Sequence, residues 1–350
     1  MTTATAIDLV RPNTMPVLPE VIYVETSNSC NSLCQTCPLT FFGNGAPRNL
    51  TLAELESIVD QLPGLKRVVL HGIGEPLLNR ELALMIRFLK ARSIHTLFNS
   101  NIIALTRRRQ AELVESGLDE LRVSLDGATE ETYRRVRGVP AFAKVVKHLR
   151  EIVEARELMA GTSPRISVWF TAMRENLVEL ADVARIAAES GADEFYVQRL
   201  VYAGYGLARE EQSICVELRR SEIKQIREAE AICREYGMGF RASGDTVAIE
   251  TLEGPGAQRD LGDVRASERP WMACHRPWYL TYITAHGDVL PCCFIPFISA
   301  SAKPAHVLGN VFRQPIADIW NGPAYRDFRF RFLSSTPYDC CAGCGSKWSV

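Results

Sequence analysis

The feature that most constrains the fold is a regular alternation of short β-rich runs with longer segments whose apolar residues recur at helical spacing. Six such runs occur between residues 21 and 200: VIYVE (21–25), RVVLH (67–71), HTLFN (95–99), ELRVSL (120–125), RISVWFTA (165–172) and EFYVQRL (194–200). Strands separated by helices pair in parallel through right-handed crossovers. A complete eight-unit barrel typically takes about 250 residues. Six units therefore predict an α/β fold, a partial (β/α)6 barrel with its site at the carboxyl ends of the strands.

The same periodicity divides the chain into regions. Helical patterns occupy residues 51–62, 80–92, 106–117, 142–155, 177–190 and 217–237. Beyond residue 240 the periodicity ends, and the Gly, Pro and charge content of residues 253–270 is typical of a linker or surface loop. We therefore expect an N-terminal extension (1–20), a partial barrel (21–240), a linker (241–270) and a small cysteine-rich α+β domain (271–350).

Composition excludes several classes of partner. The net charge of −1 provides no electrostatic basis for binding nucleic acid or an anionic membrane. The N-terminus lacks the basic and apolar segments of a secretion signal. No run approaches the roughly 18 apolar residues that a transmembrane helix needs. We expect a soluble, cytoplasmic protein that binds neither nucleic acid nor membrane.

The chain has 11 cysteines, and their distribution is uneven. Cys30, Cys34 and Cys37 lie together, and six more fall in the last 77 residues. In a reducing compartment such groups bind metal or carry redox chemistry more often than they form disulfides. The remaining two, Cys215 and Cys233, lie in a helical pattern and are predicted to be small buried apolar residues.

The three clustered cysteines follow the first predicted strand, where a barrel holds its chemistry. Soft thiolates at this spacing suit zinc or an iron–sulfur cluster. Zinc favours a closed set of four ligands, and no cysteine or histidine occurs within 30 residues after Cys37. Three thiolates around a four-iron cubane leave one iron open to an external ligand. The spacing therefore favours a cluster with an open coordination site.

Cys-x3-Cys-x2-Cys after the first strand of a β/α barrel resembles the radical S-adenosylmethionine superfamily. HGIGEPLL (71–78) resembles the family's Gly-Gly-Glu-Pro motif, and NSNII (99–103) stands where members carry a Thr-Asn-Gly turn. VSLDGATEETYRRVRG (123–138) resembles a Ser-x-Asp-Gly segment. The resemblance implies a [4Fe-4S] cluster whose open iron binds S-adenosylmethionine. Reduction by an external partner such as flavodoxin or ferredoxin would then yield a 5′-deoxyadenosyl radical that abstracts hydrogen from a substrate.

The resemblance also implies the residues that contact S-adenosylmethionine. They are Gly72, Gly74, Glu75, Pro76, Asn101, Ser124, Asp126 and Arg137. The glycines would let the backbone approach the ligand, and Glu75 would accept from its ammonium group. Taken singly these are ordinary turn residues or solvated charges, and their order along successive strands carries the resemblance. Thr36 replaces the aromatic residue common before the third cysteine, so Phe41 or Phe42 is expected to contact the adenine.

The C-terminal region resembles another domain of this superfamily. The spacing of Cys274, Gly287 and Cys292 matches the opening of a SPASM-type domain, and the chain ends soon after Cys341-x2-Cys344. The shortened "twitch" form implies one auxiliary [4Fe-4S] cluster. Its ligands would be Cys274, Cys292, Cys341 and Cys344, with Cys293 and Cys340 as substitutes for their neighbours. A structural zinc site would use the same four cysteines.

Three functions are compatible with these motifs. The chain resembles twitch-bearing aminocyclitol and sugar dehydrogenases and nucleoside-sugar decarboxylases of natural-product biosynthesis. This implies oxidation or decarboxylation of a small carbohydrate-, aminocyclitol- or nucleoside-like substrate. A peptide maturase is the alternative, although such enzymes often carry a leader-recognition module and only 20 residues precede the first predicted strand here. The third is a zinc-stapled, non-enzymatic scaffold.

Polar residues at the ends of other strands are candidates for lining the substrate cavity. They are Glu25, His71, Gln198 and Arg199. An arginine there could hold a hydroxyl or carboxylate group. The structural alternatives are an acid at the barrel end for Glu25, a hydrogen-bonded core histidine for His71 and a surface charge for Arg199.

Overall fold

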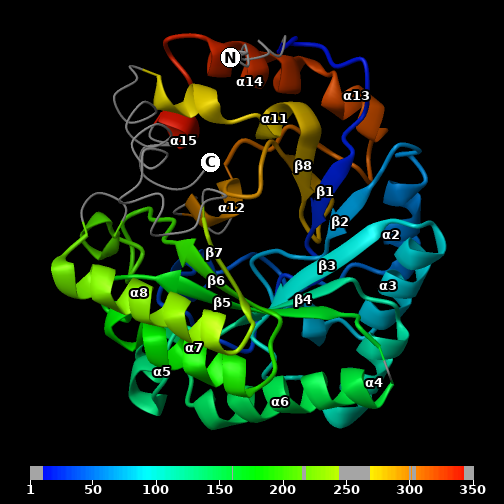
Figure 1. Cartoon of the computed structure of the whole chain (residues 1–350). Helices are drawn as coiled ribbons and strands as arrows, with labels where there is room; N and C mark the ends of the chain where they lie inside the picture. The colour runs from blue at the N-terminus through cyan, green and yellow to red at the C-terminus, as the bar shows by residue number, and fades with distance from the viewer. Residues whose placement is uncertain are drawn as a thin grey trace, which may run out of the picture.

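The computed structural model describes residues 11–159, 161–214, 218–243, 269–298, 301 and 305–342. One sheet of ten strands forms its centre, in the order β10-β9-β8-β1-β2-β3-β4-β5-β6-β7 (Figure 1). Strands β1 to β7 pair in parallel along this order. The α/β fold with a partial parallel barrel is therefore confirmed.

All six predicted strands are present. Their bounds are β1 Val21–Val24, β2 Arg67–Val69, β3 His95–Ser100, β4 Glu120–Ser124, β5 Arg165–Ala172 and β6 Glu194–Arg199. A seventh parallel strand, β7 (Gly239–Ala242), adds to β6. It escaped prediction because it has only four residues and little apolar character.

Helices cover the outer face of the parallel strands (Figure 1). They are α2 Leu52–Val59, α3 Leu82–Ala91, α4 Arg107–Glu115, α5 Glu130–Arg137, α6 Phe142–Leu158, α7 Leu180–Glu189 and α8 Arg220–Glu235. A five-residue helix, α1 (Pro38–Phe42), follows the cysteine loop, and 3-10 turns η1 (Pro76–Leu78), η2 (Leu177–Glu179) and η3 (Glu210–Gln212) complete the connections. Cys233 is fully buried in α8, as predicted, whereas Cys215 lies outside the described residues.

The two faces of the barrel strands differ in polarity. In β5, Ile166, Val168 and Phe170 are fully buried among the helices. Arg165 and Trp169, which alternate with them, remain partly accessible on the inner face. Because successive side chains of a strand point to opposite faces, this alternation makes the outer face the hydrophobic core and leaves polar and aromatic groups inside the barrel.

The C-terminal region joins the barrel sheet instead of standing apart from it. Strand β8 (Leu280–Ile283) pairs in parallel with β1, and β9 (Asp288–Leu290) and β10 (Gly309–Asn310) continue the sheet antiparallel. Gly287 turns the β8–β9 hairpin at a φ of 82°, and a Cβ there would overlap the Phe312 ring. Around the hairpin lie η4 Pro270–Ala273, α11 Arg276–Tyr279, α12 Ile295–Ile298, α13 Ile316–Trp320, α14 Pro323–Leu333 and α15 Asp339–Ala342.

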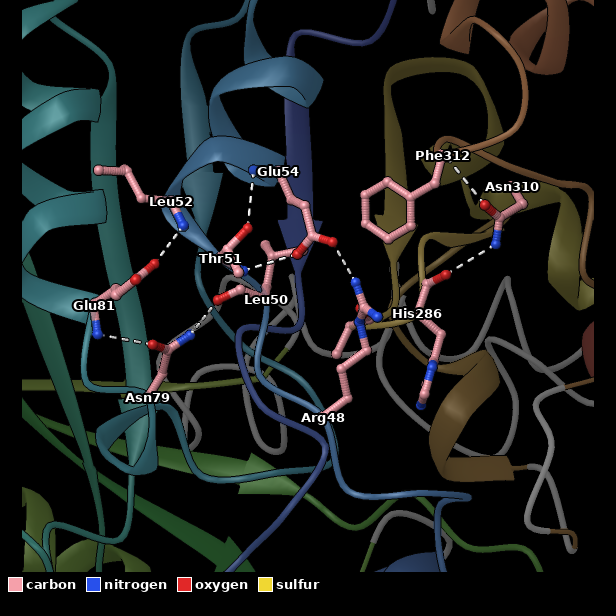
Figure 2. Close-up of polar contacts among 11 residues, drawn as sticks. Arg48, Leu50, Thr51, Leu52, Glu54, Asn79, Glu81, His286, Asn310 and Phe312 are labelled. Atoms are coloured by element: carbon pink, nitrogen blue, oxygen red, sulfur yellow. Dashed lines mark hydrogen bonds and ion pairs between the residues drawn. The ribbon is translucent and has the colours of Figure 1, made fainter.

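Polar contacts join this hairpin to the N-terminal part of the barrel (Figure 2). Arg48 donates from Nε to the carbonyl of Ala285 at 2.6 Å and forms an ion pair with Glu54. Glu54 also completes a capping box with Thr51 at the start of α2. Hence one arginine couples the start of the first barrel helix to the β8–β9 turn. The proposed linker falls mostly on residues 244–268, which lie outside the described residues.

No helix in the described part of the chain has the length and apolar character needed to cross a membrane.

Candidate functional site

The loop from Cys30 to Cys37 follows β1 and is held against the end of α5. The backbone amides of Leu33 and Gln35 donate to the carbonyls of Arg137 and Val136, at 3.1 and 2.8 Å. The hydroxyl of Ser32 donates to the Arg137 carbonyl as well, at 2.9 Å. Backbone contacts to one helix end therefore position the loop.

The three cysteines of this loop are partly buried. Burial raises the pKa of Cys30 to about 12, with Glu75 and then Cys34 adding to the effect. Burial, followed by Cys34, also raises the pKa of Cys37. Buried thiols of this kind become thiolates when a cation stabilises them.

Two N–H donors point at these sulfurs. Arg137 Nη1 lies 3.4 Å from Cys34 Sγ, and Asn101 Nδ2 lies 3.7 Å from Cys30 Sγ. Hydrogen bonds to the sulfurs are typical of iron–sulfur sites, where they adjust the reduction potential. In the described ranges, no three His, Cys, Asp or Glu side chains converge on a point that a single metal ion could occupy.

Glu75 is buried and ties together the turns that follow β2 and β3. Its carboxylate accepts from the Ser100 hydroxyl at 2.6 Å, the Asn101 amide at 2.8 Å and the Leu77 amide at 3.0 Å. Burial raises its pKa, and these hydrogen bonds oppose that shift. A contact from Glu75 to the ammonium of S-adenosylmethionine stays a prediction. What the geometry adds is a positioning role that the sequence did not reveal.

The two motif glycines are required by the protein itself. A Cβ on Gly74 would lie 2.0 Å from the carbonyl oxygen of Ser27, and one on Gly72 would lie 2.4 Å from Cγ of Glu25. The sequence suggested that these positions are glycine so that a ligand can approach. The structure gives a more direct reason, because this turn packs closely on the segment after β1. Pro76 then begins η1, with Glu75 at its N-terminal cap.

Asp126 and Arg137 form a buried ion pair beside the cysteine loop. Arg137 Nε lies 2.8 Å from Asp126 Oδ2, and Asp126 Oδ1 accepts from the Thr171 amide at 2.7 Å. Ser124, which ends β4, is partly accessible and stands opposite Trp169 in the strand register. The expected roles of these three residues toward the cofactor stay predictions, and the ion pair places Arg137 where it also reaches Cys34.

The substrate-cavity candidates divide into two groups. Glu25 is buried and accepts from the amides of Ile73 and Ala285, each at 3.0 Å, so it joins β1, the motif turn and the β8–β9 hairpin. It also lines a small, open pocket together with Ile73 and Tyr282. Gln198 and Arg199 are partly accessible at the end of β6. This supports the structural alternative for Glu25 and leaves the other two open to a ligand.

His71 lies at the end of β2 and stacks on Phe297 of α12, with ring centroids 6.1 Å apart. Its Nδ1 atom is buried and has no hydrogen-bond partner in the described part of the chain. Burial, reinforced by Arg122, lowers the pKa of His71 to about 4. The imidazole is therefore neutral near pH 7, with a free polar atom on the inner side of the barrel.

Sequence analysis missed the aromatic residues of the inner face. Trp169 of β5 and Tyr196 of β6 stack with ring centroids 4.0 Å apart, and Arg122 of β4 lies over Trp169 at 4.4 Å. We call these three residues the aromatic platform. The signal was present in the strand alternation, because all three positions fall on the inner face, where an aliphatic core is not needed.

A second aromatic group stands beside the cysteine loop. Tyr205 packs against both Phe41 and Phe42, with centroids 5.4 Å from each. The Cys37 thiol lies close enough to raise the pKa of Tyr205 further, beyond the larger effect of burial. Thr36 is partly accessible in the same loop. Sequence analysis expects Phe41 or Phe42 to contact the adenine in place of an aromatic residue at position 36. Tyr205 is a third candidate for that contact.

The C-terminal cysteines are brought together by packing. Cys274 and Cys341 are buried in one apolar cluster, Cys292 and Cys293 pack against an adjacent one, and Cys340 contacts both. The sulfurs of Cys340 and Cys341 are 3.8 Å apart. The fourth expected ligand, Cys344, lies outside the described residues. The described cysteines are compatible with the ligand set expected for an auxiliary cluster.

Comparison with known proteins agrees with this geometry. Residues 24–164 match the model of the radical SAM superfamily, and residues 274–345 match SPASM, an iron–sulfur cluster-binding domain. The mycofactocin maturase MftC of Mycolicibacterium smegmatis is 30% identical over 52% of this chain and 45% of its own length. The AdoMet-dependent heme synthase of Methanosarcina barkeri is 23% identical over 89% of this chain and 85% of its own length. The chain thus spans about half the length of the maturase.

Among solved structures, Streptococcus suis SuiB bound to its precursor peptide SuiA superposes with a TM-score of 0.67 at 18% identity, covering 91% of this chain and 68% of SuiB. This likeness confirms the fold of the barrel together with the C-terminal region. Both domain models imply iron–sulfur clusters, and the first also implies S-adenosylmethionine. Residues 24–164 therefore form a radical SAM domain, and residues 274–345 form a SPASM domain, which is an iron–sulfur cluster-binding domain.

Proposed function

We propose that this enzyme abstracts hydrogen from a small carbohydrate-, aminocyclitol- or nucleoside-like substrate in natural-product biosynthesis, and so oxidises or decarboxylates it. The observation that carries this proposal is the aromatic platform of Trp169, Tyr196 and Arg122 on the inner face of the barrel. Partly accessible aromatic side chains suit contact with a sugar ring or a nucleobase, and a small rigid ligand loses little entropy on docking there.

Residues near the aromatic platform can make polar contacts with the same substrate. Gln198, next to the end of β6, can hydrogen-bond a substrate hydroxyl, because amide groups both donate and accept. The neutral His71 provides an Nδ1 atom without a partner among the described residues. Fixing the ring through several such contacts places one C–H bond for attack, which is a demand on orientation.

The cofactors would be held by the residues already described. Cys30, Cys34 and Cys37 would bind the [4Fe-4S] cluster with S-adenosylmethionine, and we propose one auxiliary [4Fe-4S] cluster on the C-terminal cysteines. When bound and reduced by a partner such as flavodoxin or ferredoxin, these groups supply a hydrogen-abstracting radical and an electron acceptor. The chain itself supplies partly buried thiols, donors to their sulfurs, and a barrel wall that β8 extends beside β1.

Peptide modification is the competing function. MftC is named a maturase, and SuiB was solved with its precursor peptide. The heme synthase, which covers more of this chain, acts on neither class by name. The relatives thus favour different substrates, whereas the aromatic platform favours a small ring.

Isotope transfer decides between these functions. The anaerobically prepared enzyme is incubated with S-adenosylmethionine, a reductant and candidate substrates deuterated at ring carbons. We expect one 5′-deoxyadenosine per product, carrying deuterium from a sugar, aminocyclitol or nucleoside. Unlabelled 5′-deoxyadenosine from every labelled small molecule, together with transfer from a labelled peptide, would assign the enzyme to the peptide maturases.

A further inference from the structure

Positive charge is concentrated on the N-terminal halves of α4 and α6, two helices that pack against each other (Figure 1). Residues 101–112 and 142–151 carry six cationic side chains and only two carboxylates, whereas the whole chain has a net charge of −1. We call these cations the basic ridge. They are Arg107, Arg108, Arg109, Lys144, Lys147 and Arg150.

Contacts between the two helices make the basic ridge one surface. Arg107 of α4 and Lys147 of α6 both pair with Glu151, at 3.7 and 2.9 Å. The side chain of Gln110 donates to the same carboxylate at 3.1 Å. One glutamate therefore joins cations from both helices and offsets only part of their charge.

The charged ends of the basic ridge lie in solvent. The side chains of Arg107, Arg108 and Lys147 are 87%, 82% and 66% exposed. Lys144 and Arg150 are exposed as well, and neither forms an ion pair with a carboxylate of the described residues. The excess of positive charge is therefore available to a partner.

Helix stability does not explain these cations. α4 begins with three arginines, has no acidic residue in its first turn, and receives no side-chain cap from Thr106. α6 carries Lys144 in a first turn that also lacks acidic residues. Cations near a helix N-terminus oppose the helix dipole. The neighbouring α5 follows the stabilising pattern, with Glu130 and Glu131 in its first turn and its arginines in the last.

The basic ridge adjoins the loop that reaches the first cysteine. Asn101 Nδ2 lies 3.7 Å from Cys30 Sγ, and the carbonyl of the next residue, Ile102, accepts from Nδ1 of His148 in α6 at 2.8 Å. The same loop continues into α4 at Arg107. Two adjacent residues thus connect the helix that carries half of the ridge to the Cys30 sulfur.

We propose that the basic ridge docks the external reductant, an acidic protein that carries single electrons, such as a flavodoxin. The inference rests on the reduction step of the proposed function and does not depend on its substrate. The carrier loses one electron, which passes to the cluster held by Cys30, Cys34 and Cys37, and no bond forms between the two proteins. Opposite charges steer and orient such an encounter. Redox encounters typically bury less than about 1,200 Å² in total, an area that two short helices can provide.

Two reductants separate docking from catalysis. Cleavage of S-adenosylmethionine by the anaerobic holoenzyme is measured with reduced flavodoxin and, separately, with dithionite, which is too small to need a docking surface. Arg107→Gln/Lys144→Gln removes one charge from each helix and leaves Glu151 paired with Lys147. We expect kcat/KM for flavodoxin to fall about 3- to 10-fold and the dithionite rate to stay unchanged. Arg107→Glu/Lys144→Glu should lower kcat/KM further.

Calorimetric titration with oxidised flavodoxin measures docking without turnover. Affinity should fall in both ridge variants. For the unmodified protein it should fall as ionic strength rises from about 0.1 M to about 1 M, because the Debye length shrinks from about 10 Å to about 3 Å. Circular dichroism and iron content establish that the variants remain folded and loaded.

The matched control is Arg313→Gln/Arg326→Gln, which removes the same charge from two exposed arginines of the C-terminal region. It should change neither the flavodoxin rate nor the affinity. Slowing by this control but not by the ridge variants would place the reductant at the C-terminal region and overturn the proposal. Equal flavodoxin rates in all variants would overturn it too, and loss of single-stranded RNA binding in the ridge variants would then assign the ridge to nucleic acid. Absence of cleavage with dithionite would instead contradict the proposed reaction.

Discussion

The two groups of cysteines are held in different ways. Cys30, Cys34 and Cys37 lie within eight residues, on a loop whose backbone is hydrogen-bonded to the end of α5. Cys274 and Cys341 are far apart in sequence and meet only because both enter one apolar cluster. That cluster contains Trp271, Trp278, Phe328 and Phe332. The first group is organised locally by hydrogen bonds, and the second is organised by long-range packing.

This difference indicates how much each site depends on its metal. Local hydrogen bonds hold the cysteine loop against α5, whereas closing a long segment costs entropy that ligand binding can offset. We therefore expect loss of the first cluster to leave the fold unchanged. Loss of the second should loosen the C-terminal region.

The largest effect is expected from replacing Cys30, Cys34 and Cys37 together with Ala. The variant should lose about four irons per chain and all cleavage of S-adenosylmethionine, because no cysteine ligand remains for the open cluster. It should keep its secondary structure and about four irons on the C-terminal cysteines. Iron, sulfide and zinc analysis with assay of 5′-deoxyadenosine measures this. Retained cleavage contradicts the assignment, and zinc at the C-terminal site would restore the zinc alternative there.

The second largest effect is expected at the adjacent cysteines Cys340 and Cys341. Cys341 is buried with the tryptophan cluster, whereas Cys340 is partly accessible and next to His306. Cys341→Ser should therefore lower the auxiliary iron content and expose α14 and α15 to limited proteolysis. Cys340→Ser is the matched control and should do so far less. The opposite ranking would make Cys340 the ligand.

Sequence reasoning succeeded where structure is local. The six strands and the cysteine spacing are encoded in short windows, so alternation and motif spacing located them. The pairing of β8 with β1 was missed because it joins residues more than 250 positions apart. Nothing near Leu280 or Val21 signals that contact.

The site was only partly predictable for the same reason. Glu75 could be singled out from its motif. Its role as acceptor for the Ser100 hydroxyl and the Asn101 backbone amide could not be predicted, because it depends on how neighbouring strands align. Trp169 and Tyr196 come from different strands, and only the β5–β6 register stacks them. Shared faces of a sheet, more than motifs, determine these contacts.

Glu75 provides the next test of local organisation. Glu75→Ala removes an acceptor and leaves the buried Ser100 hydroxyl and Asn101 amide without a partner, which costs about 1–3 kcal/mol of stability per group. Cofactor binding should weaken by about 1.5–3 kcal/mol if the predicted ammonium contact exists. Glu75→Gln keeps an acceptor and should recover most of the stability but not the affinity. Urea midpoints and calorimetry separate the two, and unchanged affinity in both variants would leave Glu75 a purely positioning residue.

The smallest effect is a pH dependence at His71, where the two regions meet through the stacking on Phe297. The pKa of His71 is lowered to about 4 by burial, against about 6.5 in the unfolded chain. The unfolded state therefore binds the extra proton between these values, and stability present above pH 6.5 is lost as the pH falls toward 4. From pH 7 to pH 5 this amounts to a loss of about 2 kcal/mol in the free energy of unfolding.

His71→Gln should remove that part of the acid sensitivity, measured as urea midpoints of anaerobically prepared protein. His95→Gln is the control, because His95 is half-exposed and beside Asp119, which opposes the lowering of its pKa. Parallel pH curves for wild type and His71→Gln would mean that the imidazole is not held in the neutral, desolvated state at this junction.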